Sequence, residues 1–357
     1  MKTMFEGKTI LVTGGTGSMG KIFVRRVLAG ELGTPKKVIV MSRDEAKQHE
    51  MRMSYLHKLV ATDEVIYRNF ANVLEFRIGD VRDYADVCAA VKDADFVVNA
   101  AALKQVPTCE YFPTQAVLTN CLGAANIARA IEEHRYPVEA VMAISTDKAC
   151  KPVNAMGMTK AIQERIFIAA NITNPKTRFI CVRYGNVLAS RGSVIPLFHS
   201  QIRNGGPLTV TVPDMTRFLL SLDHAVDTVF TALREAKRGE TYVPDAPSAT
   251  VMNIAKALAG KRKIEIQVTG VRPGEKMHEV MVSDEEVHHC VKRGSYYAIR
   301  PMLPELSGGH RPEPNAFTKE FSSADKVLDL AGTTALLKKH KLMPEDVDPA
   351  AAEELLR

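Results

Sequence analysis

The chain has 357 residues, of which 46% are hydrophobic and 25% charged, and its formal net charge is +6. These values are ordinary for one large or two modest globular domains and indicate neither a disordered nor a fibrous protein. No block of Lys and Arg resembles a nucleic-acid arm, and no apolar run approaches the ~20 residues of a membrane helix. We therefore expect no nucleic-acid or membrane partner.

The N-terminal residues lead straight into an apolar segment and do not resemble a signal peptide. The cysteines are scattered along the chain without a Cys-x-x-Cys pair, which predicts reduced, mostly buried thiols in a cytoplasmic protein. They are Cys88, Cys109, Cys121, Cys150, Cys181 and Cys290.

The first half of the chain alternates short apolar segments with helical stretches. A helix is expected over 21–28, directly after a glycine-rich turn. The expected strands are 9–12, 38–41, 73–78, 96–99, 140–145 and 179–182. Strand, crossover and strand in repetition predict an α/β fold of the Rossmann type, a doubly wound parallel sheet with helices on both faces. In such sheets ligands bind beyond the carboxyl ends of the strands, where the polar motifs of this chain fall.

The composition of the sequence changes after about residue 190, where glycines and prolines, Gly192 among them, break the chain into shorter elements. We expect a Rossmann domain over 1–190 and a smaller substrate domain over 191–300. Within the latter, a helix over 223–236 and a strand over 241–243 bring residues 223–245 back to the main sheet. Residues 301–357 form a C-terminal extension, rich in Pro and Gly over 303–314 and helical around 323–339. Its end, 343–357, is acidic and is expected to be a short helix or a loose tail.

A glycine-rich turn follows the first expected strand. Gly14, Gly17 and Gly20 form the pattern Gly-x-x-Gly-x-x-Gly. Glycine permits the tight turn and lets the backbone approach a pyrophosphate, and the helix N-terminus supplies N–H groups and a positive dipole. The turn therefore predicts a dinucleotide site that includes Gly14, Thr16, Gly17, Ser18, Met19 and Gly20.

The residues after the second strand bear on the choice of dinucleotide. Ser42 and Arg43 come first and Lys47 lies one helical turn later, and an arginine matches a ribose 2′-phosphate. This pattern predicts NADP. The alternative is that Arg43 is a surface cation and that Asp44 accepts hydrogen bonds from the ribose of NAD. Further along the cofactor we expect Asp80 and Val81 at the adenine, and Ala100, Ala101 and Ala102 near the nicotinamide ribose.

Residues 144–160 nearly match a Tyr-x-x-x-Lys motif. The lysine, Lys160, is present, but Met156 stands at the tyrosine position and cannot take a proton. Asp147 and Lys148 lie just upstream and are the candidates to supply acid–base chemistry. They can face one ligand only if this segment forms a turn, because neighbours on a strand point to opposite sides. The alternative is an ion pair at a helix start, with Asp147 as the cap.

Together these segments resemble the extended short-chain dehydrogenase/reductase superfamily. Within it, the chain is most similar to the inverting UDP-N-acetylglucosamine 4,6-dehydratases of capsule and O-antigen biosynthesis, polysaccharide biosynthesis proteins in a branch that carries Met for Tyr. The resemblance extends over about residues 1–335. It rests on the segments 12–20, 42–48, 100–107, 145–160, 183–186, 192–197, 215–222 and 272–279.

The resemblance implies that NADP oxidises carbon 4 of a UDP-sugar, that water then leaves carbons 5 and 6, and that the proton returns to the opposite face of carbon 5. It assigns Lys148 as the base, Asp147 as the acid, and Lys160 to the nicotinamide ribose. The 4-hydroxyl proton would pass to Lys148, to the hydroxyl of Ser145 or Thr146, or to a water relay. Such roles require a lowered pKa for Lys148 and a raised pKa for Asp147.

For the UDP-sugar, the resemblance points to Arg272 at the diphosphate and Glu275 at the uridine ribose. The other candidates for substrate contact are Lys104, Met156, Asn186 and Arg217. Relatives of this kind are homo-oligomers, for example hexamers. No metal is expected, because the adjacent residues His288 and His289 point apart and no other ligand cluster exists. Two alternatives stay open: a UDP-sugar 4-epimerase, and a non-catalytic protein that binds NADP or a nucleotide-sugar.

Overall fold

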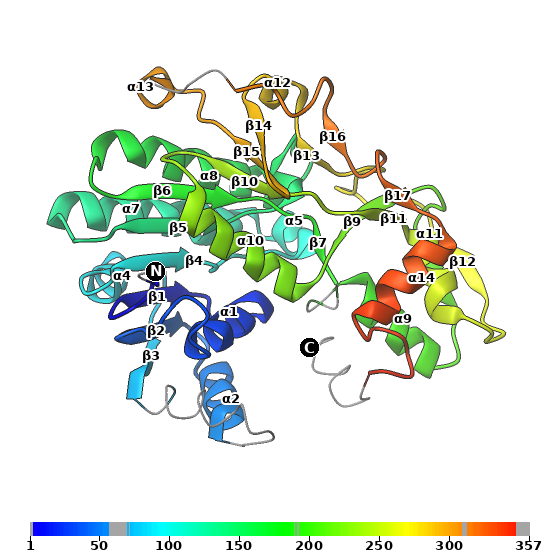
Figure 1. Ribbon diagram of the computed structural model, residues 1–357. Coiled ribbons are helices and arrows are strands. Elements are labelled where there is room, and N and C mark those ends of the chain that lie inside the picture. The colour runs from blue at the N-terminus through cyan, green and yellow to red at the C-terminus, as the bar shows by residue number, and fades with distance from the viewer. Residues whose placement is uncertain are drawn as a thin grey trace.

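The computed structural model describes residues 3–56, 70, 72–188, 190, 193–308 and 313–347. A nine-stranded sheet, in the order β14-β15-β10-β6-β5-β4-β1-β2-β3, runs through the larger lobe (Figure 1). Its first six strands in the chain are parallel, which confirms the Rossmann-type sheet expected from the sequence. They are β1 (Thr9–Thr13), β2 (Lys37–Ser42), β3 (Leu74–Ile78), β4 (Phe96–Asn99), β5 (Ala140–Ile144) and β6 (Arg178–Val182).

The central strands are almost continuous apolar runs because helices cover both of their faces. All five residues of β1 are buried, and Val12 lies opposite Val40 on β2 and Val98 on β4. Helices α1 (Ser18–Leu28) and α10 (Leu222–Glu235) contribute to the core on one face. Helices α4 (Tyr84–Val91), α7 (Gly123–His134) and α8 (Ala155–Thr173) contribute to the core on the other, so the sheet is doubly wound.

The far side of the sheet carries strands from the second half of the chain. Strand β10 (Thr241–Pro244) pairs in parallel with β6. Strands β15 (Tyr296–Ile299) and β14 (Cys290–Arg293) then extend the sheet in antiparallel pairing, which the sequence analysis did not anticipate. The antiparallel pairing follows from the short connection: two residues separate these strands, and Gly294 has a φ of +59°, as a tight hairpin turn requires.

A smaller lobe lies beside the carboxyl ends of the parallel strands (Figure 1). Its four-stranded sheet joins β17 (Val327–Leu328), β11 (Ser248–Thr250), β9 (Thr216–Leu220) and β7 (Asn186–Val187). Two further pairs are β8 (Leu208–Val210) with β12 (Ile266–Val268), and β13 (Val280–Val282) with β16 (Phe321–Ser322). Helices α9 (Val194–Arg203), α11 (Val251–Ala259) and α14 (Leu330–Lys339) share one apolar core with β8, β9, β11 and β12.

Residues beyond 301 divide between the two lobes: β17 and α14 belong to the smaller lobe, whereas Phe321 of β16 packs in the core of the larger one. The helix expected around 323–339 begins only at Leu330. Strand β17 occupies the preceding residues, and the side chain of Asp329 caps the helix. Likewise, α1 begins at Ser18, three residues before the predicted start. Gly192, residues 309–312 and the acidic tail from 348 on lie outside the described residues.

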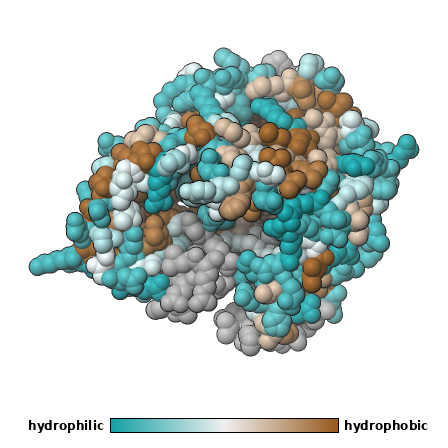
Figure 2. Space-filling view, turned by 180° about the vertical axis from the view of Figure 1, so that it is seen from behind, coloured by the Kyte–Doolittle hydropathy of each residue, from teal (hydrophilic) through white to brown (hydrophobic). Residues whose placement is uncertain are grey.

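The remaining helices are short or lie at the periphery. They are α2 (Glu45–Leu56), α5 (Val106–Tyr111), α6 (Pro113–Ala116), a π-helical turn (Val117–Leu122), a 3-10 turn (Asp147–Ala149), α12 (Asp284–Val287) and α13 (Pro304–Ser307). Among the residues that the structure describes, no helix has the length and apolar character needed to cross a membrane. The surface seen from behind is mostly hydrophilic, with hydrophobic residues gathered in patches (Figure 2).

Candidate active site

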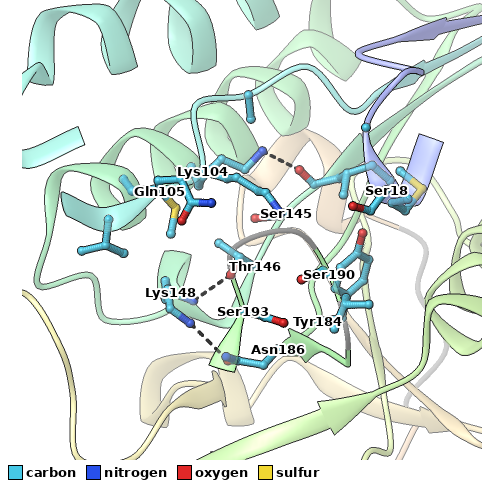
Figure 3. Close-up of a pocket in the computed structure, with 18 of the residues that line it drawn as sticks. Ser18, Lys104, Gln105, Ser145, Thr146, Lys148, Tyr184, Asn186, Ser190 and Ser193 are labelled. Carbon is cyan, nitrogen blue, oxygen red and sulfur yellow. Dashed lines mark hydrogen bonds between the residues drawn. The ribbon is translucent and has the colours of Figure 1, made fainter. Parts of the chain in front are cut away.

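A cavity of about 440 Å³ lies at the carboxyl ends of β1, β4, β5 and β6, where the two lobes meet (Figure 3). It brings together most of the residues that the sequence singled out, although they come from segments far apart in the chain. Those that line it are Gly14, Gly17, Ser18, Met19, Gly20, Ala100, Ala102, Lys104, Thr146, Lys148, Met156, Lys160, Asn186, Arg272 and Glu275.

The glycine-rich turn forms one end of this cavity. Gly14 has a φ of +65°, and a Cβ atom there would lie 2.7 Å from the Cα atom of Ala101. A Cβ atom on Gly20 would lie 2.6 Å from the Cα atom of Gly15. The N-cap of α1 is Gly17, which has no side chain that could cap the first turn of the helix. This bare helix start fits the pyrophosphate of a dinucleotide.

The predicted ribose and adenine residues lie outside this cavity, along the ends of β2 and β3. The Ser42 Oγ atom is 3.1 Å from the Thr16 Oγ1 atom. The Arg43 Nη1 atom lies 3.6 Å from an Asp80 carboxylate oxygen, and the Lys47 Nζ atom lies 2.6 Å from Asp44. The ribose position therefore has both cations and carboxylates beside it.

Two acidic side chains of this region are held in the ionised form, and Val81 is buried beside them. Hydrogen bonds from Lys47 lower the pKa of Asp44. Burial alone would raise the pKa of Asp80, but hydrogen bonds from Arg82 and the charge of Arg43 lower it. A 2′-phosphate at this position would have to share Arg43 and Lys47 with these carboxylates.

Lys160 lies deep in the cavity wall, on α8. Its Nζ atom donates to the backbone oxygen of Ile144, at 2.5 Å, and to the Oε1 atom of Gln163, at 2.8 Å. Burial lowers the pKa of Lys160 to about 8. These two hydrogen bonds direct the ammonium group toward the end of β5, beside the position expected for the nicotinamide ribose.

Met156 lies one helical turn before Lys160 and also lines the cavity. Its side chain is 4% exposed and packs in a small apolar cluster with Cys109 and Ala116. The structure thus places a packing residue where related motifs have a phenol, and the groups that can handle a proton lie elsewhere in the wall.

Those groups gather around Lys148. Its Nζ atom lies 3.1 Å from the Asp147 Oδ1 atom, 3.1 Å from the Glu279 Oε1 atom and 3.4 Å from the Asn186 Oδ1 atom. The backbone after β5 forms the 3-10 turn, capped by the Thr146 hydroxyl, so Asp147 and Lys148 meet although they are sequence neighbours. Figure 3 shows Lys148 directed toward Asn186.

Asp147 does not itself line the cavity. Its side chain is completely buried behind Thr146 and Lys148, and its Oδ1 atom accepts a hydrogen bond from the Thr146 hydroxyl at 2.9 Å. The Oδ2 atom has no hydrogen-bond partner among the described residues and lies 3.0 Å from the position that a Cβ atom on Gly185 would take. Asp147 can therefore act on a ligand in the cavity only through Thr146 and Lys148.

The titration of this cluster differs from the expectation on one point. Burial raises the pKa of Asp147, as expected, and the nearby Glu279 carboxylate adds to the rise. Burial alone would lower the pKa of Lys148, but the carboxylates of Asp147 and Glu279 outweigh it and raise the pKa. The predicted lowering is therefore wrong for this structure, because the sequence did not reveal that a second carboxylate faces the lysine.

The predicted contacts to the sugar nucleotide divide into two groups. Arg272 and Glu275 line the cavity, and the buried Oε2 atom of Glu275 has no hydrogen-bond partner in the described part of the chain. Arg217 does not line this cavity. It lies buried on β9, donates to the backbone oxygen of Thr216 at 2.7 Å, and faces Glu279 at 3.9 Å.

Sequence analysis gave no role to several residues that form the cavity or its charged cluster. Glu279 closes the segment 272–279, and Tyr184 belongs to the segment 183–186, so the motifs contained both without indicating their positions. Ser193 lines the wall as well, with a buried hydroxyl that has no partner in the described ranges.

A doubly wound sheet, a glycine-rich turn at β1, and a buried lysine at the second half of a Tyr-x-x-x-Lys position together define the extended short-chain dehydrogenase/reductase class. A family model described as "Polysaccharide biosynthesis protein" matches residues 10–301. The chain therefore belongs to the polysaccharide biosynthesis protein family, whose members modify nucleotide-sugars.

Relatives and solved structures agree with this placement. The chain is 45% identical over 304 residues to the UDP-glucose 4-epimerase of Rickettsia bellii, which covers 84% of either protein, and 44% identical to that of Rickettsia typhi over the same share. Its structure superposes on Pen from Bacillus thuringiensis with a TM-score of 0.84 and 31% identity, over 95% of this chain and 100% of Pen. The dTDP-glucose 4,6-dehydratase DesIV from Streptomyces venezuelae, with NAD bound, shares the fold at a TM-score of 0.63 and 21% identity over 75% and 86% of the two chains.

Proposed function

We propose that this enzyme oxidises carbon 4 of a UDP-hexose and reduces it again from the other face, as a 4-epimerase. The observation that carries this proposal is one cavity that joins a dinucleotide-type glycine turn to a proton-handling lysine and to the arginine and glutamate expected for a sugar nucleotide. The relatives that are 43–45% identical bear the name UDP-glucose 4-epimerase, and several neighbours in fold are described with NAD bound.

The chain's own residues divide the work along the cavity. Gly14, Gly17 and the start of α1 would hold the pyrophosphate, and Lys160 the nicotinamide ribose. When bound, a nicotinamide dinucleotide supplies the hydride acceptor and donor for carbon 4. Arg272 would bind the diphosphate of the substrate, which leaves the hexose between Lys160 and Lys148.

The proton of the 4-hydroxyl needs an acceptor other than Met156. Lys160 lines the cavity with a pKa lowered to about 8, so its neutral amine can take this proton. Thr146 and Lys148 connect the cavity to Asp147 behind them, and this chain of hydrogen bonds can supply a proton to the sugar. General acid–base groups of this kind typically contribute roughly 10²–10⁴-fold to the rate.

A second candidate function is the 4,6-dehydration of UDP-N-acetylglucosamine with inversion at carbon 5. The charged cluster favours it, because Asp147, Lys148 and Glu279 provide more acid–base groups than proton transfer at one hydroxyl requires. Both reactions share the 4-keto intermediate, and they differ in whether a proton leaves carbon 5.

One experiment separates these functions. The protein is incubated in deuterium oxide with UDP-glucose or UDP-N-acetylglucosamine and with NAD or NADP, and the products are followed by NMR. An epimerase gives the carbon-4 epimer without deuterium at carbon 5. A dehydratase gives a 4-keto-6-deoxy sugar that carries deuterium at carbon 5. Binding of both ligands without any product would leave the non-catalytic alternative, and that result would refute the proposal.

The proposal extends to the choice of dinucleotide, the division of the chain and the oligomeric state. NADP is the preferred dinucleotide, since Arg43 and Lys47 lie at the ribose end. Residues 1–190 bind the dinucleotide, and residues 191–300 contribute Arg272 and Glu275 to the binding of the sugar nucleotide. The protein is a homo-oligomer, because the large apolar side chains of Tyr111, at the end of α5, and Phe112, between α5 and α6, are 84% and 60% exposed.

A further inference from the structure

Glu279 is a buried carboxylate that lies behind the cavity wall and contacts the wall through Lys148. It lies just before β13, its side chain is 2% exposed, and its Oε2 atom has no hydrogen-bond partner among the described residues. Its Oε1 atom forms the ion pair with Lys148 at 3.1 Å. A buried carboxylate needs compensation by nearby cations, so the neighbours of Glu279 decide its charge.

Among the residues that the structure describes, three cations face Glu279, whereas Asp147 has one. Besides Lys148, the Arg217 Nε atom lies 3.9 Å from Oε1 and the Lys276 Nζ atom lies 3.9 Å from Oε2. Asp147 is paired with Lys148 alone. When two carboxylates share one ammonium group, the one with additional cations keeps its charge and the other is driven toward its neutral form.

The other elements that pack against this turn do not change that balance. Helix α8 brings Lys160 and Glu164 nearby. Lys160 is bonded to Ile144 and Gln163, and Glu164 is paired with Arg183 at 2.7 Å. Strand β7 contributes the neutral amide of Asn186. The charged groups that act on Asp147 are therefore Lys148 and Glu279, whereas Arg217 and Lys276 face Glu279.

We propose that Glu279 is a positioning residue of this site, which holds Lys148 as an ammonium ion at the cavity wall and thereby leaves Asp147 as a neutral carboxylic acid. The pKa shifts of the cluster have the matching directions. The pKa of Glu279 is lowered, since its three cations outweigh its burial, and the pKa of Asp147 is raised. The charge assignment stands on the structure alone. Its catalytic consequence, an acid available behind Thr146 and Lys148, rests on the proposed function.

Infrared spectroscopy of the folded protein tests this inference without any turnover. The carbonyl stretch of a protonated carboxyl group is distinct from the bands of carboxylates. We expect the wild-type protein to show such a band at neutral pH, and Asp147→Asn to remove it. Absence of an Asp147-dependent band in the wild-type protein would overturn the proposal, and this measurement does not require any Glu279 variant to fold.

Replacement of Glu279 gives the second part of the test. In Glu279→Gln, Asp147 becomes the sole counter-ion of Lys148, so the midpoint at which the Asp147 band disappears should fall by about 1–3 pH units. Glu279→Asp keeps the charge and should keep the band. Glu320→Gln removes a surface carboxylate that pairs with Lys151 and should leave the band unchanged. An unshifted midpoint in a folded Glu279→Gln protein would show that Glu279 does not control Asp147.

Activity measurements then separate failure of this inference from failure of the proposed function. If the protein turns over a UDP-sugar, the limb of the kcat profile that reports loss of the Asp147 proton should move to lower pH in Glu279→Gln, with KM little changed. If no UDP-sugar is turned over, the proposed function fails while the infrared result stands by itself. A purely structural role for Glu279 would lower the amount of folded protein without moving this limb.

Discussion

The two ends of the cavity are built from different materials. The dinucleotide end consists of backbone and small residues, with Gly14 packed too closely against Ala101 to admit a Cβ atom and no side-chain cap at the start of α1. The sugar end consists of charged side chains buried against one another, centred on Lys148 and Glu279. The first end would bind its ligand through shape and a helix dipole, whereas the chemistry at the second depends on the protonation states of a few buried side chains.

This difference implies different sensitivities to mutation. A methyl group added at the dinucleotide end collides with fixed backbone, so it should affect binding and folding. A charge removed at the sugar end changes the titration of its neighbours while the fold has other support, so it should affect chemistry. Four substitutions test this contrast, in order of decreasing effect.

The largest effect is expected for Lys148→Ala. Removal of the ammonium group that faces the hexose should lower kcat roughly 10²–10⁴-fold. The affinity for the dinucleotide should stay unchanged, because Lys148 lies at the opposite end of the cavity. Steady-state kinetics and a fluorescence titration with the dinucleotide measure the two effects. Lys319→Ala, which alters an exposed lysine of the same charge, should have neither effect, and near-normal turnover of Lys148→Ala would contradict the role of Lys148.

Gly14→Ala should affect the other end. The positive φ disfavours alanine, and the new Cβ atom would meet the backbone at Ala101, so we expect a loss of roughly 2–4 kcal/mol in the free energy of unfolding. Thermal or urea unfolding, with and without dinucleotide, measures it. Gly7→Ala is the matched control, because Gly7 has a similar φ of +69° but nothing within 4 Å of its Cβ position. Equal losses in the two variants would show that the close approach to Ala101 is unimportant.

Arg43→Ala should weaken NADP binding by about 1.5–3 kcal/mol, the usual contribution of a charge-assisted contact. NAD binding should change less, because NAD has no 2′-phosphate. Calorimetric titrations with both dinucleotides give the comparison. A 2′-phosphate would compete with Asp80 for Arg43 and with Asp44 for Lys47, so the titrations show whether Arg43 is available to the phosphate. Equal weakening of both dinucleotides would show that Arg43 does not read the phosphate.

The smallest effect is expected for Met156→Leu. The side chain is a packing residue between the cavity and a small apolar cluster, and a volume-conserving exchange usually costs less than about 1.5 kcal/mol. Most of the turnover should therefore remain. Met156→Tyr should not increase kcat, because a phenol would enter a site shaped for a thioether. A large gain with tyrosine would mean that the proton path of related enzymes is intact here and only lacks its acceptor.

Much of the fold and of the dinucleotide end could be predicted from the sequence. Parallel buried strands produce continuous apolar runs, and the glycine spacing at 14, 17 and 20 follows from one local turn, so both signals lie within short windows. Helix limits were less accurate: the helix expected around 323–339 begins at Leu330, because pairing of β17 with β11 takes the preceding residues. The antiparallel hairpin of β14 and β15 was also missed, since its strands are short and resemble those of the smaller lobe.

The sequence by itself determined the chemical inventory: a Rossmann-type sheet, a dinucleotide turn, a lysine without its tyrosine, and an acid and a base side by side. Local spacing is enough for these, because backbone geometry and residue type act over a few positions. Only the tertiary structure decided how the charges are shared. Glu279 comes from a segment far from Asp147 and Lys148 in the chain, and its carboxylate, together with that of Asp147, reverses the expected shift of the Lys148 pKa. Electrostatic effects in a low-dielectric interior depend on distances that no local pattern encodes.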